Sequence, residues 1–123
     1  PHLLAEHQAY IAKQLGSSNP KPAFLVMHGG SGSTKEEIQS AVKNGVIKMN
    51  IDTDTQWAYW DGLKNFYKKN EGYLQNQVGN PDGADKPNKK YYDPRVWIRA
   101  SEEAMIARAK ESFIALNAAN SYQ

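Results

Sequence analysis

The chain has 123 residues, which is close to the usual size of one domain. Its residues are 40% hydrophobic and 23% charged, an ordinary globular composition that excludes disordered, collagen-like and coiled-coil proteins. Fifteen Lys and Arg residues against 13 Asp and Glu residues give a formal net charge of +2. A charge this balanced does not indicate nucleic acid or an anionic membrane as the main partner.

The longest uninterrupted apolar run, residues 23–27, is far shorter than the roughly 20 residues that a membrane-spanning helix requires. The absence of cysteine excludes a disulfide scaffold, a thiolate metal site and a cysteine nucleophile. It fits a reducing compartment, and we expect a cytoplasmic protein. The chain starts at Pro1, with no initiator methionine and no signal peptide before a helical pattern. We therefore expect a cut end and a segment of a longer protein.

Apolar spacing and turn residues predict the elements of the chain. In chain order these are helix 3–15, strand 23–28, helix 33–43, strand 46–51, helix 54–69, a loop at 79–92 and C-terminal helices within 94–117. Leu4, Ile11 and Leu15 share one stripe of the first helix. Ser33 and Glu36 have the spacing of a capping box, with Ser33 as N-cap of the second helix. The apolar run at 23–27 is typical of a strand that is covered on both faces.

The second half of the chain is predicted to be mainly helical. Trp57 and Trp60 begin a stripe of large apolar residues that we expect to face a core. Asp93 followed by Pro94 has the pattern of an N-cap with proline at the first helical position. Ser101 is a candidate break in the helical region that follows.

Strand, helix and strand in close succession predict a βαβ unit with two parallel strands. Two parallel strands are not a stable sheet, and both read as strands covered on two faces. We therefore expect an α/β fold that is a slice of a larger α/β array and not a compact autonomous domain.

The candidate chemistry lies where the two strands end. Because side chains alternate along a strand, His28 shares a face with Val26, and Asn50 shares a face with Lys48. His28 and Asn50 therefore come close together at the carboxyl edge, where α/β proteins build their sites. The alternative for His28 is a hydrogen-bonded structural residue. The loop at 29–33 leads into a helix N-terminus, which favours an anion; its alternative is a flexible connector.

Other basic residues leave two interpretations open. Lys48 on the second strand is a candidate Schiff-base amine or a structural ion-pair partner. Lys86, Lys89 and Lys90 with Arg95 are a candidate phosphate site or a solvated cluster, and Arg95 has a fixed location in the first turn of a helix.

Four ordered motifs resemble the class II fructose-bisphosphate aldolases. They are His28-Gly29-Gly30-Ser31-Gly32-Ser33, the segment Gly-Val-Ile-Lys-Met-Asn-Ile-Asp-Thr-Asp-Thr-Gln at 45–56, Gly-Asn-Pro at 79–81, and Pro-Asn-Lys-Lys-Tyr-Tyr-Asp-Pro-Arg-Val-Trp at 87–97. The likeness spans almost the whole chain. It implies a zinc-dependent (β/α)8 barrel of which this chain is roughly the last third. On this resemblance, residues 1–123 form the C-terminal part of a single (β/α)8 barrel domain, with two parallel strands, flanking helices and a helical C-terminal extension.

The resemblance also implies a role for individual residues. His28 corresponds to a zinc ligand at the end of strand seven, and Asn50 to the catalytic amide that contacts the triose and its enediolate. Arg95 is similar to the arginine that reaches the second phosphate from the partner subunit of a homodimer. Further substrate contacts are implied for Gly29, Gly30, Ser31, Ile51, Asp52 and Thr53. The glycine loop would hold the phosphate of dihydroxyacetone phosphate, and part of it would meet a monovalent cation, Na⁺ or K⁺.

The implied reaction is the zinc-dependent cleavage of fructose 1,6-bisphosphate to dihydroxyacetone phosphate and glyceraldehyde 3-phosphate, and its reversal, in glycolysis and gluconeogenesis. The alternatives are a tagatose-bisphosphate aldolase, a Schiff-base aldolase that uses Lys48, and a non-catalytic module that binds sugar phosphates. A zinc site usually takes three protein ligands, and this chain offers one convincing ligand, His28. We therefore expect the isolated chain to be inactive and to need the N-terminal portion of the barrel.

Overall fold

The computed structural model describes residues 2–121, so the expectation about Pro1 lies outside the described residues. The chain divides into two compact units. The first contains residues 1–54 and 110–123, and the second contains residues 55–109.

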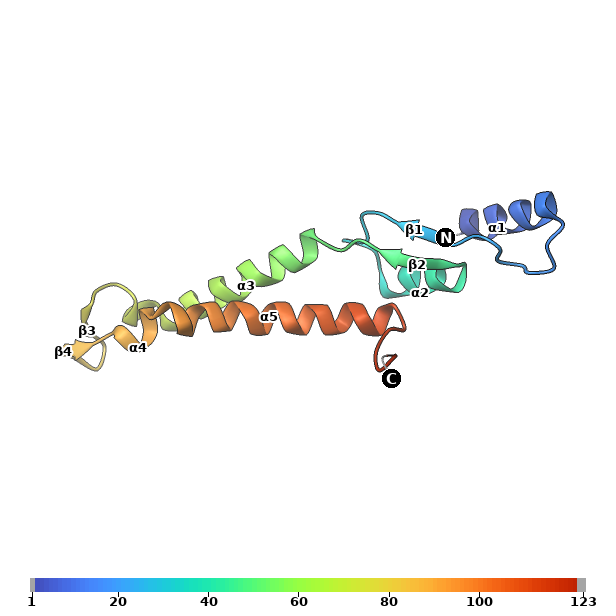
Figure 1. Cartoon of the computed structure of the whole chain (residues 1–123). Helices are drawn as coiled ribbons and strands as arrows, with labels where there is room; N and C mark the ends of the chain where they lie inside the picture. The colour runs from blue at the N-terminus through green and yellow to red at the C-terminus, as the bar shows by residue number, and fades with distance from the viewer. Residues whose placement is uncertain (1, 122–123) are drawn as a thin grey trace. The chain divides into compact units, whose positions relative to one another are not determined.

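The first unit contains a βαβ motif preceded by a helix (Figure 1). Its elements in order are α1 (His2–Leu15), β1 (Leu25–Met27), α2 (Lys35–Lys43) and β2 (Val46–Met49). The two strands pair in parallel, with a register shift between Leu25 and Val26. The prediction of adjacent parallel strands joined through a helix is therefore confirmed, although both strands are shorter than predicted.

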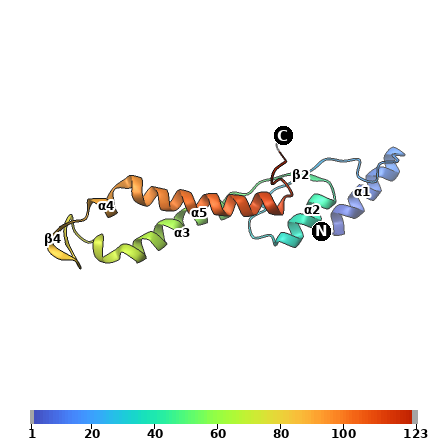
Figure 2. The same ribbon diagram turned by 90° about the horizontal axis from the view of Figure 1, so that it is seen from below.

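Helix α2 lies against β2 in both views (Figures 1 and 2), and its apolar face forms the core of this unit. Ile38 and Ala41 on α2 and Val46 on β2 are buried. The expected capping box exists, but one residue later than predicted, because the N-cap is Thr34. The Glu37 amide donates to Thr34 Oγ1 at 3.2 Å, and the Thr34 amide donates to the Glu37 carboxylate at 2.8 Å. The neighbouring Ser33 has the same spacing to a glutamate, so the sequence alone does not show which of the two residues is the N-cap.

Gln8 joins α1 to the rest of this unit. Its side chain is only 2% exposed. The amide nitrogen donates to the carbonyl oxygens of Ala23 at 2.8 Å and of Asn44 at 3.0 Å, and the amide oxygen accepts from the Ala23 amide at 3.1 Å. One side chain therefore connects the helix to the segment that enters β1 and to the turn that precedes β2.

The second unit consists of two long helices and a short hairpin. The helix α3 (Thr53–Asn70) belongs to this unit from Thr55 onward, and η1 (Glu71–Tyr73) follows it. The strands β3 (Val78–Asn80) and β4 (Gly83–Pro87) pair antiparallel. The chain continues through α4 (Lys89–Tyr92) into α5 (Pro94–Ala115), whose residues up to Ala109 belong to this unit. As predicted, Asp93 accepts a hydrogen bond from a backbone amide of the first turn of α5.

The prediction of a loop at 79–92 is wrong, because this segment contains most of the β3–β4 hairpin and all of α4. The hairpin is organised by Asn88, which is fully buried. Its side-chain nitrogen donates to the carbonyl oxygens of Asn76 at 2.7 Å and Gly79 at 3.0 Å, while its side-chain oxygen accepts from Asn80 Nδ2 at 2.6 Å. Side-chain amides thus replace the apolar contacts that usually reveal a hairpin in a sequence.

The expected break at Ser101 is also wrong, since α5 continues through it. Ser101 is fully buried at the point where α3 approaches α5. A Cβ placed on Gly62 of α3 would lie 2.7 Å from the carbonyl oxygen of Ala100 and 2.8 Å from the Cβ of Ala104. The two helices are therefore in close contact at a point where Gly62 faces Ala100, Ser101 and Ala104, all of them small residues.

Large apolar side chains remain exposed in both units. Trp57 and Trp60, which we expect to face a core, are 58% and 55% exposed, so the described residues of this chain do not cover them. In the first unit, Phe24, which immediately precedes β1, is 83% exposed, and Ile47 of β2 is 65% exposed. Within the described residues, no helix is both long and apolar enough to cross a membrane.

Candidate active site

The structure brings His28 and Asn50 together at the carboxyl ends of β1 and β2. The backbone amide of Asn50 donates to the carbonyl oxygen of Met27 at 3.0 Å, which extends the strand pairing by one bond. Both side chains are exposed, and Nδ2 of Asn50 lies 3.0 Å from Nδ1 of His28. The prediction that these two side chains lie close together at the carboxyl edge of the sheet is therefore confirmed.

The glycine loop folds back on the same strand end. Gly29 has φ +69°, a left-handed conformation that glycine adopts without a steric penalty. The Gly30 amide donates to the carbonyl oxygen of Asn50 at 2.9 Å, and a Cβ on Gly30 would lie 2.5 Å from Met49 Sδ. Gly30 therefore provides close packing and a backbone bond, and its N–H is already engaged.

Ser31 connects the glycine loop to the beginning of α3. Its hydroxyl oxygen accepts a hydrogen bond from the Asp54 amide at 3.3 Å, within the first turn of the helix. Ile51 and Asp52 connect β2 to that turn, and Thr53 is its first residue. The glycine loop and the start of α3 thus lie together, with Ser31 bound to the first turn of the helix.

Arg95 belongs to the second unit, where it forms a fork-shaped ion pair with Asp93. Its Nε donates to Asp93 Oδ1 at 2.9 Å, and its Nη2 donates to Oδ2 at 2.6 Å. These side-chain bonds, together with the bond from the Arg95 amide, lower the pKa of Asp93 to about 2. The same hydrogen bonds raise the pKa of Arg95 above its ordinary value. The arginine side chain is 85% exposed, so the guanidinium is positioned by Asp93 and still faces solvent.

His28 and its neighbours supply only part of a metal site within the described residues. The exposed imidazole of His28 is the kind of nitrogen ligand that zinc takes in proteins. Among residues 2–121, no three His, Asp or Glu side chains are close enough to hold a metal ion. His28 fits a zinc site as one ligand, and the described part of the chain does not complete the set.

The lysine candidates are placed differently. Lys48 lies on β2 in register with Val26 of β1 and is exposed. Lys86 lies on β4 with Asp85 3.9 Å away, whereas Lys89 and Lys90 lie on α4. Lys90 stands over the ring of Tyr91 at 5.0 Å from the centroid. The predicted basic loop is thus split between two elements, with local partners for Lys86 and Lys90.

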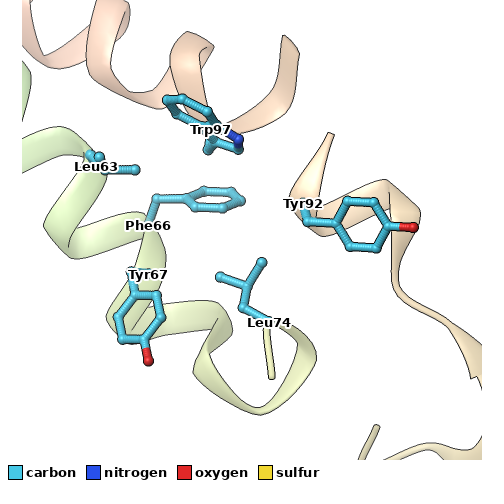
Figure 3. Close-up of a pocket in the computed structure, with 6 residues that line it drawn as sticks. All are labelled: Leu63, Phe66, Tyr67, Leu74, Tyr92 and Trp97. Carbon is cyan, nitrogen blue, oxygen red and sulfur yellow. The ribbon is translucent and has the colours of Figure 1, made fainter. Parts of the chain in front are cut away.

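An apolar cavity of about 260 Å³ lies in the second unit (Figure 3). Its lining comes from α3, α4, α5 and the residue after η1: Leu63, Phe66, Tyr67, Leu74, Tyr92 and Trp97. The ring of Phe66 extends between Trp97 and Leu74, and the hydroxyls of Tyr67 and Tyr92 point away from the centre. Because no group of polar atoms converges there, this cavity has the character of a packing surface.

Two contacts were missed by reasoning from sequence. The bond from Asp54 to Ser31 crosses 23 residues and has no local signal. The sequence pattern predicts Asp93 only as a helix cap, although its position two residues before Arg95 allows both the cap and the fork-shaped ion pair. The Asp-Pro-Arg order was the signal available for that pair.

The His28 imidazole, the Asn50 amide and the glycine loop lie at the carboxyl ends of adjacent parallel strands. This is the arrangement of an α/β protein whose site is built where its strands end. The sequence model of the family described as fructose-bisphosphate aldolase class-II matches residues 1–121. The chain therefore belongs to the class II fructose-bisphosphate aldolase family.

Similar proteins support the same family. The chain is 58% identical over 117 residues to fructose-bisphosphate aldolase of Haemophilus influenzae, covering 95% of this chain and 32% of that protein. It is 57% identical over 118 residues to fructose-bisphosphate aldolase class 2 of Escherichia coli K12, covering 96% and 33%. A crystal structure of fructose-bisphosphate aldolase from Campylobacter jejuni matches with a TM-score of 0.89 and 54% identity, covering 96% of this chain and 34% of that chain.

The chain thus spans about a third of the length of the relatives that it matches. The predicted fold class agrees with this coverage. The chain is a mixed α/β segment that corresponds to part of an aldolase barrel, and its described residues form no closed barrel.

Proposed function

We propose that this chain forms the C-terminal part of an enzyme that cleaves fructose 1,6-bisphosphate to dihydroxyacetone phosphate and glyceraldehyde 3-phosphate, and that catalyses the reverse condensation. The observation that carries the proposal is the contact of the His28 imidazole with the Asn50 amide at 3.0 Å, beside the glycine loop, in a chain of this family. The reaction belongs to glycolysis and gluconeogenesis, and it takes place in the cytoplasm.

In this proposal His28 is one protein ligand of Zn²⁺, and the remaining ligands come from the rest of the protein. When bound, zinc supplies a Lewis acid that polarises the ketose carbonyl. Asn50 is the catalytic amide, which binds oxygen atoms of the triose. Its backbone is held by bonds to Met27 and Gly30, so its side chain starts from a fixed position.

The phosphate of dihydroxyacetone phosphate is proposed to bind where the glycine loop meets the start of α3. Ser31 and the backbone of Gly29 supply donors, while Gly30 allows the close approach of the loop to β2. Ile51, Asp52 and Thr53 complete the substrate-binding stretch, in which the Asp52 carboxylate is suited to a sugar hydroxyl. Part of the glycine loop meets the monovalent cation, Na⁺ or K⁺. A carboxylate repels phosphate, so we assign the anion to the backbone amides.

The second phosphate is proposed to bind Arg95. One residue, Pro94, separates this arginine from Asp93, whose carboxylate holds the guanidinium by two hydrogen bonds. A planar guanidinium binds phosphate oxygens in pairs, and its exposure leaves donors available. By resemblance, the arginine serves the site of the partner subunit in a homodimer.

The chain also requires the earlier part of the barrel in this proposal. Exposed apolar residues on the strand segment, including Phe24, Val26 and Ile47, support a covering partner of this kind. We expect the isolated 123-residue chain to bind zinc weakly and to cleave no fructose 1,6-bisphosphate. Addition of the earlier segment should restore activity if the two parts dock.

His28→Ala in the full-length protein tests the proposal. Loss of one of three ligands should remove most of the bound zinc and most of the turnover, as measured by metal analysis and a coupled cleavage assay. Stoichiometric zinc in this variant would refute the metal assignment. Borohydride trapping on Lys48 in the presence of substrate would favour the Schiff-base alternative. Preference for tagatose bisphosphate, or binding without turnover, would favour the other two alternatives.

A further inference from the structure

The contact between Asn50 and His28 occupies Nδ1, one of the two imidazole nitrogens through which His28 can bind a metal ion. The Asn50 amide nitrogen carries two hydrogens and no available lone pair, so Nδ1 of His28 is the acceptor in this bond. A neutral imidazole that accepts at Nδ1 carries its proton at Nε2. Neither ring nitrogen then has a free lone pair, although metal coordination uses a neutral imidazole nitrogen.

We propose that Asn50 and the metal ion compete for Nδ1 of His28, so that metal binding releases the Asn50 side chain for the substrate. The inference rests on the proposed function in one respect, which is the use of His28 as a metal ligand. It adds a coupling between metal loading and the availability of the amide that binds the triose.

The backbone around Asn50 restricts how this exchange takes place. Its backbone amide donates to the carbonyl oxygen of Met27 at 3.0 Å, and its backbone carbonyl oxygen accepts from the backbone amide of Gly30 at 2.9 Å. The main chain therefore stays in place, and release requires only rotation of the exposed side chain. The amide group moves from one partner to another without unfolding the loop.

Coupling of this kind is reciprocal. If the Asn50 bond disfavours metal at Nδ1, removal of the bond must strengthen metal binding by the same factor. An intramolecular hydrogen bond between neutral groups corresponds to about a 2- to 10-fold effect on an equilibrium constant. A substrate that engages the Asn50 amide must likewise tighten metal binding.

The test uses the full-length protein, prepared without metal and labelled with ¹⁵N in its histidines. Long-range ¹H–¹⁵N spectra should assign Nε2–H and an accepting Nδ1 to His28, and addition of Zn²⁺ should shift the Nδ1 signal. Zn²⁺ affinity is then measured against a competing chromophoric chelator. We expect Asn50→Ala to bind Zn²⁺ about 2- to 10-fold more tightly than the parent protein. Asn50→Leu, which keeps most of the side-chain volume, should change the affinity in the same direction.

Asn65→Ala is the matched control, because Asn65 is an exposed asparagine whose side chain donates to Asp61 at 2.9 Å. Its Zn²⁺ affinity should equal that of the parent. A metal-free His28 with its proton at Nδ1, or unchanged or weaker affinity in both Asn50 variants, would overturn the inference. If His28→Gln still loses zinc in that case, the proposed function stands without the competition. If His28→Gln keeps its zinc, the metal assignment in the proposed function fails instead.

Discussion

Replacement of Gln8 should lower the free energy that is needed to open the first unit. Its buried side chain makes three hydrogen bonds to the backbone, two to carbonyl oxygens and one from an amide. At about 1 kcal/mol for each bond, Gln8→Ala should cost about 3 kcal/mol. Ala is the better helix former, which offsets a few tenths of a kcal/mol at most. Gln8→Glu should cost at least as much, because a carboxylate oxygen would then face the carbonyl oxygens of Ala23 and Asn44.

Native-state hydrogen exchange of the full-length protein measures this cost. The Ala23 amide, which donates to Gln8, should exchange about 100-fold faster in Gln8→Ala, as expected for about 3 kcal/mol. Gln14→Ala is the control, because Gln14 is an exposed glutamine on the same helix. A change of less than 5-fold at Ala23, or an equal change in the control, would show that Gln8 does not hold α1 in place.

Three further predictions concern the second unit. Arg95→Ala should reduce kcat/KM for fructose 1,6-bisphosphate more than for fructose 1-phosphate, and equal losses would count against the phosphate role. The Asp93 carboxyl should titrate near pH 2 by NMR and return toward its ordinary value in Arg95→Ala. Because the folded pKa is depressed, this pair stabilises the protein fully above about pH 4, and its contribution is lost as the pH falls toward 2. Gly62→Ala should destabilise the helix pair by about 1–3 kcal/mol in urea unfolding, because its Cβ would meet Ala100 and Ala104; a gain in stability from helix propensity would contradict this.

The βαβ motif could be predicted because its signals are local and agree with one another. A short apolar run precedes a glycine loop, and a capped amphipathic segment separates it from a second run. Strand alternation then placed His28 and Asn50 on neighbouring strand ends, and their 3.0 Å contact confirms that they meet. The hydrogen bond itself was beyond prediction, because it depends on side-chain rotamers. The choice between Ser33 and Thr34 as N-cap failed for a similar reason, since both residues offer a hydroxyl with a glutamate three positions later.

The second unit was harder to predict because long-range contacts dominate it. The strands of the hairpin contain glycine, proline and charged residues, so the usual alternation is absent, and the buried amide of Asn88 stabilises them instead. Ser101 resembles a helix breaker until Gly62 is known to lie opposite it. The apolar spacing of Trp57 and Trp60 identified a face that requires cover, although within the described residues both remain more than half exposed.

The arrangement around Asn88 has a consequence for how the hairpin opens. The single side chain satisfies two carbonyl oxygens and one neighbouring amide, and the Asn88 backbone amide also donates to Gln77 at 2.9 Å. Withdrawal of that side chain would leave all its partners unsatisfied at once, so no strand can fray by itself at low cost. We therefore expect β3 and β4 to open and close as one cooperative unit, with a common rate for their protected amides.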